Sequence, residues 1–324
     1  DRDCNPFRFF RTDEILTDEL DIVARYFTDP FDFPVVLAPG NTIIEGHRGS
    51  GKSWILRYMS LDVQARDAFP LPYVGFYVKC KPSAFDSTRR RDEPPDLWRD
   101  FFNHYFNIVV VSRIVDAFSS LADRNPGIVP EPVADRIGNY IATYVFRRPS
   151  IHRSEGSAAG MLRHLYNEIE LLGDDCRSRR HSLRPEDMSS GSVLDRFFEE
   201  MRHLLPALFD RGTRAYVLLD EFDNLDQDQQ RVLLTRFRDR SATYSFKIAV
   251  KLGLMTYQDM TGSFLELGHD YSHVSTDRFD RKVRQEYTDF LRRVANTRLS
   301  KEGFQITVDD LLPSRPAGSK GDIC

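Results

Sequence analysis

Residues 46–53, with the sequence GHRGSGKS, contain three glycines, a lysine and a final serine at the spacing of a phosphate-binding loop. Glycine lets the backbone adopt conformations that are closed to residues with a Cβ, so successive N–H groups can converge on one anion. Lys52 adds a positive charge for phosphate groups, and the hydroxyl of Ser53 is a suitable ligand for Mg²⁺. The spacing therefore predicts a nucleotide-phosphate site formed by Gly46, Gly49, Ser50, Gly51, Lys52 and Ser53.

The segments on both sides of this loop decide between a working site and a chance match. Residues 42–44 form a short β-branched run, which is typical of a buried parallel strand. Residues 54–59 begin a helical pattern, and the N-terminus of that helix would point at the phosphates. Strand, loop and helix therefore follow one another as a Walker A motif requires.

A second buried strand is expected to end in a pair of carboxylates. Residues 215–219 form a continuous apolar run, typical of a central parallel strand, and Asp220 and Glu221 follow directly. We interpret the pair as a Walker B motif, in which Asp220 holds Mg²⁺ and Glu221 polarises the water that attacks the γ-phosphate. Lys52, at the γ-phosphate, is the second catalytic candidate. The alternative is an ordinary strand that ends in a polar turn.

The residues after this pair continue an alternating order of helix and strand. Residues 226–238 carry apolar residues at helical spacing, and Asp223 is expected to cap this helix. The alternative is that Asp223 adds a further carboxylate to the site. Residues 246–250 form another apolar run, typical of a strand. This order predicts an α/β fold of the P-loop NTPase class, a three-layer sandwich around a parallel sheet.

In these motifs the chain resembles AAA+ and related ATPases, and among them the origin-recognition-like ATPases, whose prokaryotic relatives are often found in mobile-element and antiviral defence systems. The resemblance is carried by Asn5, Pro6 and Phe7 and by residues 41–56, 216–225 and 278–299. It implies that the nucleotide is ATP, bound with Mg²⁺, and no N-K-x-D guanine motif opposes this. It also implies a polar sensor of the γ-phosphate after the next strand, for which Lys251 and Thr256 are candidates.

Between Ser53 and Asp220 the chain is much longer than one helix, one strand and one helix require. Residues 73–79 have the pattern of the intervening strand, which leaves residues 82–192 as a mostly helical insertion. The helix candidates in this region and directly after it are 97–118, 133–146, 158–172 and 193–208. The insertion either binds a partner protein or nucleic acid, or it packs as a cap over the nucleotide.

Arginines of the insertion either contact phosphates or are solvated loop charges: Arg89, Arg90, Arg91, Arg147, Arg148, Arg177, Arg179 and Arg180. Residues 277–299 have a helical pattern and are expected to form a lid-like segment. In AAA+ proteins a lid arginine often contacts the γ-phosphate and a neighbouring subunit supplies an arginine finger. By this resemblance the candidates are Arg278, Arg281, Arg292 and Arg298.

These patterns divide the chain into five segments. Residues 1–81 are the first part of the ATPase core with Walker A, 82–192 the insertion, 193–276 the rest of the core with Walker B, and 277–312 the lid-like helical segment. Residues 313–324, rich in Pro, Gly and Ser, are expected to be a linker or tail, so that the chain is part of a longer protein.

The composition of the 324 residues fits a cytoplasmic ATPase with more than one structural unit. Hydrophobic residues make up 41%, enough for a substantial core, and a net charge of −4 gives no general basic surface for nucleic acid. We find no apolar stretch of the roughly eighteen residues that cross a bilayer and no secretory signal, so no membrane partner is expected. The four cysteines, like the His and Asp residues of 268–273, lack the spacing of a metal site.

Together these motifs predict Mg²⁺-dependent binding and hydrolysis of ATP that drives a conformational switch, by resemblance in a DNA-associated or antiviral defence assembly. The alternative is a nucleotide-gated module that binds DNA or a partner protein with little or no turnover. A small-molecule kinase would share the phosphate loop, but the Asp-Glu strand end argues against it. The expected partners are ATP and a second copy or another protein, with DNA as a further candidate.

Overall fold

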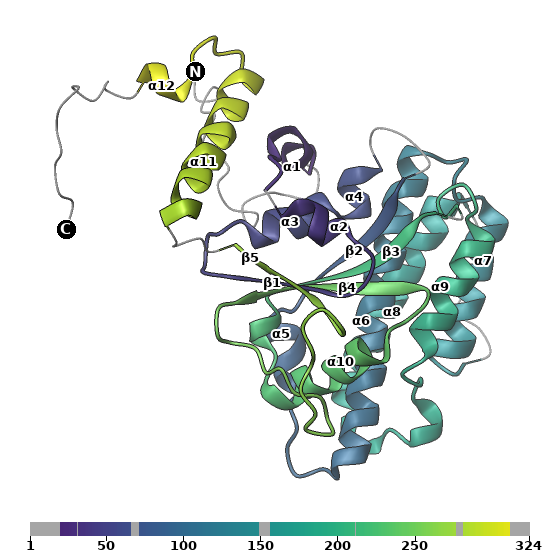
Figure 1. Ribbon diagram of the computed structural model, residues 1–324. Coiled ribbons are helices and arrows are strands. Elements are labelled where there is room, and N and C mark those ends of the chain that lie inside the picture. Colours follow the sequence, from purple (N-terminus) through teal and green to yellow (C-terminus); the bar gives the residue numbers. More distant parts are fainter. Residues whose placement is uncertain are drawn as a thin grey trace. The chain divides into compact units, whose positions relative to one another are not determined.

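The computed structural model of the chain describes residues 20–30, 32–65, 71–148, 156–210, 212–276 and 281–311, of which residues 281–286 are described by their backbone alone. The chain divides into two compact units (Figure 1). The larger is Asp32–Asp277, and the smaller combines Asp1–Phe31 with Arg278–Cys324. The aromatic residues Phe7, Phe9 and Phe10, like Asn5 and Pro6, lie outside the described residues.

A five-stranded sheet forms the centre of the larger unit, in the order β2-β3-β4-β1-β5. All neighbouring strands are parallel, so their carboxyl ends meet at one edge. The strands are β1 (Thr42–Gly46), β2 (Tyr73–Lys79), β3 (Arg214–Asp220), β4 (Tyr244–Lys251) and β5 (Ser272–Ser275). The predicted α/β fold is confirmed, and four of the five strands follow the apolar runs of the sequence.

Short helices cover one face of this sheet (Figure 1). They are α2 (Phe33–Leu37) and α3 (Lys52–Tyr58), and α4 (Leu61–Gln64) follows at the β2 edge, where it also contacts α6. Helix α3 follows the predicted phosphate loop and buries Ile55 and Leu56 against the sheet. Its first residue is Lys52, so the loop ends where the free N–H groups of the helix begin.

The predicted insertion forms most of the layer on the opposite face, below the sheet in Figure 1. The rings of Phe76 on β2 and Phe118 on α6 meet edge to face at 5.6 Å, and Phe106 of α6 lies 6.4 Å from Phe246 of β4. The helices of this layer are α5 (Pro82–Phe85), α6 (Pro95–Arg124), α7 (Glu131–Tyr140), α8 (Ala158–Ser178), α9 (Val193–Leu204) and α10 (Gln227–Asp239). The main helices therefore cover the face opposite α3 and do not cap the loop.

Shorter helical segments connect these helices. A π-helix continues α7 at Ile141–Val145, and 3₁₀ turns lie at Asp86–Thr88, Arg180–Ser182, Pro185–Asp187 and Phe222–Asn224. Four predicted helices are confirmed as α6, as α7 with its π-helix, as α8 and as α9, with ends that differ by up to six residues.

Helix α6 corrects one expectation from the sequence. It contains an 18-residue window that is apolar and long enough to cross a membrane, although we expected no such stretch. Of that window, 78% is buried inside the fold, because the helix lies between the sheet and α8. This burial is typical of the core helix of a soluble protein, with which the structure is compatible.

The smaller unit contains three described helices, α1 (Asp21–Tyr26), α11 (Arg281–Lys301) and α12 (Val308–Leu311). Helix α11 corresponds to the predicted lid-like pattern. The Arg298 guanidinium is buried 5.1 Å from the ring centre of Tyr26, and Arg292 pairs with Asp289 and Asp309. Both arginines thus have partners inside this unit, whereas Arg278 and the side chain of Arg281 lie outside the described residues.

Candidate functional site

The loop of residues 46–53 joins β1 to α3 and uses glycine where its backbone requires it. Gly49 and Gly51 have φ angles of 86° and 93°, which side chains with a Cβ rarely adopt. Gly46 is needed for a different reason, because a Cβ there would lie 2.0 Å from the Oγ1 atom of Thr276. The loop has the backbone form that a phosphate cradle requires, at the N-terminus of a helix.

Lys52 lies over this loop. Its Nζ donates to the carbonyl oxygens of Gly46 and His47, each at 2.7 Å, and to Ser50 Oγ at 3.3 Å. The ammonium group is therefore held among the atoms that would surround a bound phosphate.

Thr276, which directly follows β5, forms hydrogen bonds with the loop and with the end of β1. Its Oγ1 lies 2.6 Å from Ser50 Oγ, and its N–H donates to the carbonyl oxygen of Glu45 at 2.8 Å. A phosphate-loop residue is thereby tied to the edge strand of the sheet.

The carboxylate of Asp220 is buried at the end of β3 and held on both oxygens. Oδ2 accepts the hydroxyl of Tyr77 at 2.6 Å, and Oδ1 accepts the N–H of Glu221 at 2.9 Å. The Tyr77 ring lies under the guanidinium of Arg57, whose Cζ is 3.9 Å from the ring centre. Burial and the charge of Asp220 raise the pKa of Tyr77 well above its usual value, so the phenol remains a donor.

Glu221 has a backbone conformation that is unusual for a residue other than glycine, with φ 55° and ψ 41°. Its side chain has two partners: Lys79 Nζ lies 3.1 Å from Oε1, and Asn224 Nδ2 donates to Oε2 at 3.1 Å. Strained backbone of this kind is concentrated at functional sites, where the surroundings hold it in place. Here the surroundings are the end of β2 and the turn after β3.

The expectation that Asp223 caps the next helix is wrong. Asp226, not Asp223, caps α10, through a capping box with Gln229. The nearly buried carboxylate of Asp223 instead lies 2.5 Å from Lys251 Nζ and accepts the N–H of Lys251 at 3.2 Å. The turn between Asp220 and the helix is long enough for Asp223 to fold back toward the end of β4.

Strand register brings these groups to one edge of the sheet. Gly46 lies opposite Lys251 across β1 and β4, and Lys79 lies opposite Asp220 across β2 and β3. Of the two sensor candidates, Lys251 thus lies beside the loop, whereas Thr256 belongs to the following segment, where its N–H donates to Gln230.

The same edge offers hard oxygen ligands to a cation. Mg²⁺ is usually held by one or two carboxylates together with phosphate oxygens and water. Ser53, in the first turn of α3, and Asp220, at the end of β3, fit that donor set. Among the described residues no group of three or more His, Cys, Asp and Glu side chains could hold a metal ion. His269, from the turn that we did not assign to a metal, pairs with Asp270 at 2.9 Å.

Sequence reasoning missed four residues of this edge: Tyr77, Lys79, Asn224 and Thr276. Tyr77 and Lys79 stand near the end of a predicted parallel strand, where polar side chains meet a ligand edge, and this signal could have found them. Thr276 gives no such signal, because its strand is too short and polar to be recognised.

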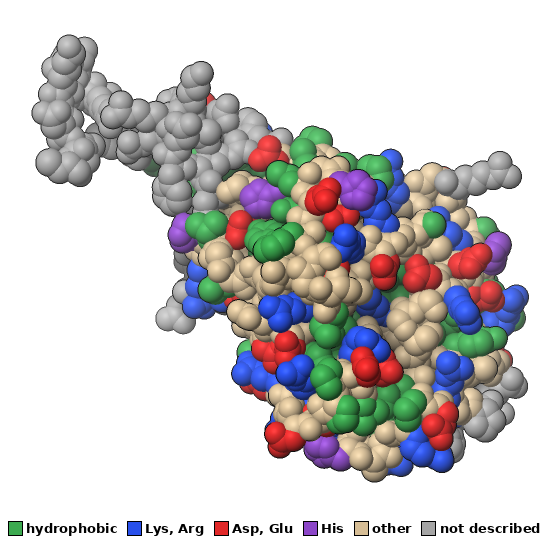
Figure 2. Space-filling view, turned by 60° about the horizontal axis from the view of Figure 1, so that its bottom comes forward, with side chains coloured by type: hydrophobic (Ala, Val, Ile, Leu, Met, Phe, Trp, Pro, Cys, Tyr) green, Lys and Arg blue, Asp and Glu red, His purple; other side chains and the backbone are tan. Residues whose placement is uncertain are grey.

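Most described arginines of the insertion are paired with acids. Arg89 contacts Asp86 at 2.8 Å and Arg90 contacts Asp228 at 3.5 Å, and Arg177 and Arg179 pair with Asp174 and Asp175. Figure 2 shows basic and acidic side chains interspersed across the face that it presents. This pairing favours the interpretation of Arg89, Arg90 and Arg179 as solvated surface charges. Arg180 fits neither alternative, because it is buried and pairs with Glu93 at 2.7 Å.

A model of the ORC-CDC6-like family matches residues 5–322, nearly the whole chain. Comparisons with curated proteins and with solved structures return no match. The family match confirms the resemblance to origin-recognition-like AAA+ ATPases that rests on the loop at 46–53 and the acidic strand end at 220–221. Nucleotide binding of the AAA+ type follows at the level of the family. The chain belongs to the ORC-CDC6-like family.

Proposed function

We propose that this chain binds ATP with Mg²⁺ at residues 46–53 and hydrolyses it, and that hydrolysis switches the conformation of the protein. The observation that carries the proposal is the meeting of two features at one sheet edge. One is a glycine loop at the N-terminus of α3, and the other is the Asp220–Glu221 end of β3. Loop and helix supply N–H donors for phosphates, and the two carboxylates supply a metal ligand and a base.

Each side chain has a defined part in this proposal. Lys52 moves from the loop carbonyl oxygens to the β- and γ-phosphates, while Ser53 and Asp220 hold Mg²⁺. When bound, the ion neutralises charge on the phosphate oxygens. Glu221 orients the attacking water, since a carboxylate has about four lone-pair sites and Lys79 and Asn224 occupy two of them. Lys251, beside the loop, is the better sensor candidate.

A second function is favoured by one specific observation. Two acidic groups at the edge where the loop lies are already engaged by lysines, Glu221 by Lys79 and Asp223 by Lys251. A site that keeps these pairs with ATP bound would hold nucleotide without turnover and act as a nucleotide-gated binding module. Family resemblance further supports work in a DNA-associated or defence assembly, as one subunit among several.

Nucleotide binding is tested by titrating a fluorescent ATP analogue into the wild type and Lys52→Ala. We expect the variant to bind at least about 100-fold more weakly, because the ammonium contacts two phosphates in a partly desolvated loop. Lys81→Ala is the matched control, since this exposed lysine lies outside the loop. Equal binding by wild type and Lys52→Ala would contradict the proposal.

A further inference from the structure

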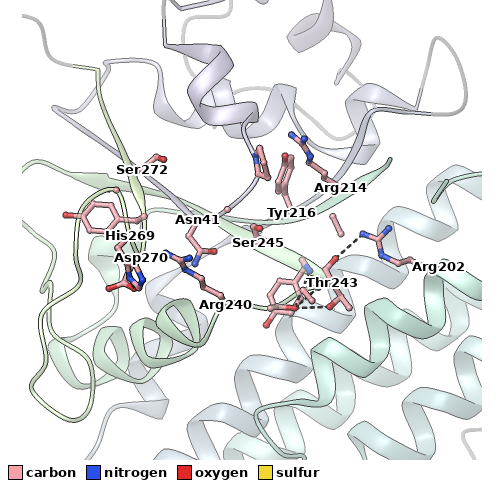
Figure 3. Close-up of a pocket in the computed structure, with 18 residues that line it drawn as sticks. Asn41, Arg202, Arg214, Tyr216, Arg240, Thr243, Ser245, His269, Asp270 and Ser272 are labelled. Atoms are coloured by element: carbon pink, nitrogen blue, oxygen red, sulfur yellow. Dashed lines mark hydrogen bonds and ion pairs between the residues drawn. The ribbon is translucent and has the colours of Figure 1, made fainter. Parts of the chain in front are cut away.

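A polar cavity lies at the edge of the sheet opposite the phosphate loop, where the strands begin (Figure 3). It has a volume of about 480 Å³ and is lined by the first residues of several strands, among them Arg214 of β3, Ser245 of β4 and Ser272 of β5. Because all strands are parallel, their full length separates this cavity from the phosphate loop.

Seven of the eighteen lining residues have a guanidinium group or an aliphatic hydroxyl. They are Arg202, Arg214, Arg240, Ser241, Thr243, Ser245 and Ser272. The one carboxylate in the lining, Asp270, is occupied by the N–H of Glu266 and by His269, each at 2.9 Å. Guanidinium and hydroxyl groups are the side chains that most often contact phosphates.

Two of the three arginines also have structural contacts. Arg202 donates to the carbonyl oxygens of Thr213 and Thr243 at 3.0 and 3.2 Å, and Arg214 donates to that of Leu37 at 3.3 Å. Arg240 differs, because its exposed side chain makes no hydrogen bond or ion pair with any described residue. In Figure 3 the Arg240 side chain points toward Asn41, between Asp270 on one side and Thr243 on the other.

The buried ammonium of Lys247 lies next to the cavity wall, where it donates to the carbonyl oxygens of Ala38 and Gly40 at 2.7 and 2.8 Å. Burial and the nearby charge of Arg214 lower the pKa of Lys247 to about 7. Its Nζ donates to three oxygens, those of Ala38, Gly40 and Thr42, so the donors open to a ligand are the guanidinium groups.

The backbone conformation at position 240 is one in which glycine, not arginine, is expected. Arg240 follows the last residue of α10 with φ 46° and ψ 102°. Glycine adopts positive φ without strain and is the usual residue just after a helix. An arginine here carries a conformational cost that glycine would avoid. Of the other two described non-glycine residues with positive φ, one is Glu221 at the candidate nucleotide site.

A purely structural explanation would be that Arg240 complements the negative C-terminal end of α10. The last turn of the helix already contains Arg236 and Arg238. Arg238 pairs with Asp259 at 2.7 Å, and Arg236 donates to Asn107 at 2.6 Å. The helix end is therefore complemented without Arg240.

We propose that this cavity is a second phosphate-binding site, in which the guanidinium group of Arg240 contacts the phosphate. The shared chemistry is a phosphate ester or anhydride, which a free nucleotide-sized ligand or the phosphodiester backbone of a nucleic acid could bring. The inference does not depend on ATP hydrolysis at the loop.

The test uses the full chain with Lys52→Ala, which removes the loop lysine, and compares it with the same chain carrying Arg240→Gly. Pyrophosphate binding is measured by calorimetry, and binding of a labelled DNA duplex by fluorescence anisotropy over a salt series. Because the position favours glycine, we expect Arg240→Gly to melt at the same or a higher temperature. We expect Arg240→Gly to bind about tenfold more weakly whichever of the two probes the parent binds. If that probe is the duplex, the slope of log affinity against log salt concentration should be smaller by about one.

Arg184→Ala is the control, since it removes the same charge from a side chain that is 70% exposed and outside the cavity. A loss confined to pyrophosphate identifies a small phosphorylated ligand, and a loss confined to the duplex identifies a phosphodiester backbone. The proposal is overturned if neither probe binds the Lys52→Ala parent. It is also overturned if Arg240→Gly binds both probes as tightly as the parent does, or loses no more affinity than Arg184→Ala.

Discussion

At the scale of single residues, the candidate site depends on how neighbouring side chains hold the two carboxylates. Asp220 is fixed through both oxygens, by Tyr77 and by the N–H of Glu221, and Glu221 is fixed by Lys79 and Asn224. The types of the two acids could be predicted from the sequence. The position of Tyr77 and Lys79 at the end of a strand could also be predicted, but their pairing with these two acids could not, because it depends on which strand lies beside β3.

Tyr77→Phe tests the importance of the hydroxyl that orients Asp220. Loss of the hydrogen bond frees the carboxylate to rotate, and partners of this kind usually change metal affinity by about 10–100-fold. We expect the Mg²⁺ concentration that half-saturates ATP-analogue binding to rise by about tenfold, with little change in metal-free binding. Tyr144→Phe, at an exposed tyrosine of the π-helix, is the control. An unchanged Mg²⁺ requirement would show that Tyr77 does not position Asp220.

At the scale of elements, the apolar runs predicted β1 to β4 and the large helices with ends correct to within six residues. Strand β5 was missed, because its four residues include two serines and a histidine and it gains its structure from pairing with β1. The pairing of Asp223 with Lys251 was missed for a related reason. Local helix-capping signals are visible in a sequence, but a contact between a turn and a distant strand end follows only from the register of the sheet.

The packing of β5 against the loop gives a prediction for Gly46. A Cβ at this position would meet Oγ1 of Thr276 at 2.0 Å, so Gly46→Ala must displace the end of β5 and lower the melting temperature. Thr276→Ala removes this atom and costs the hydrogen bond to Ser50. We expect the free energy of unfolding of the double variant, measured with urea, to exceed by about 1 kcal/mol the value obtained by adding the two single effects. Additive effects would mean that the two residues do not conflict.

At the scale of the whole molecule, the larger unit contains the sheet, the phosphate loop and the acidic strand end, and the chain leaves this unit directly after Asp277. Thr276, the residue that touches the loop, is therefore next to the point where the smaller unit begins.

The stability of the whole protein should depend on pH through His104. Burial lowers the pKa of this histidine to about 4, and its Nδ1 accepts the N–H of Ser189 at 3.0 Å. The unfolded chain takes up the proton near pH 6.5 while the folded protein does not. The contribution of neutral His104 to the free energy of unfolding is therefore complete above about pH 6.5. The free energy of unfolding falls by at most about 3 kcal/mol as the pH drops to about 4.

Chemical unfolding of wild type and His104→Gln at several pH values measures this contribution. The variant should lose the part of the pH slope between about 4 and 6.5 that His104 supplies. His203→Gln, at an exposed histidine of α9, should keep the slope of the wild type. If His104→Gln has the same pH dependence as the wild type, the histidine does not remain neutral in the folded protein.

The central claim, that this member of the ORC-CDC6-like family hydrolyses ATP through Glu221, is tested most directly by phosphate release. Wild type and Glu221→Gln are compared with Mg²⁺ and ATP, alongside ATP-binding titrations of both. We predict equal binding within about twofold and a release rate at least about 100-fold lower in the variant, because the amide cannot accept a proton from water. Tight binding by the wild type without phosphate release, or equal release by both proteins, would contradict the account.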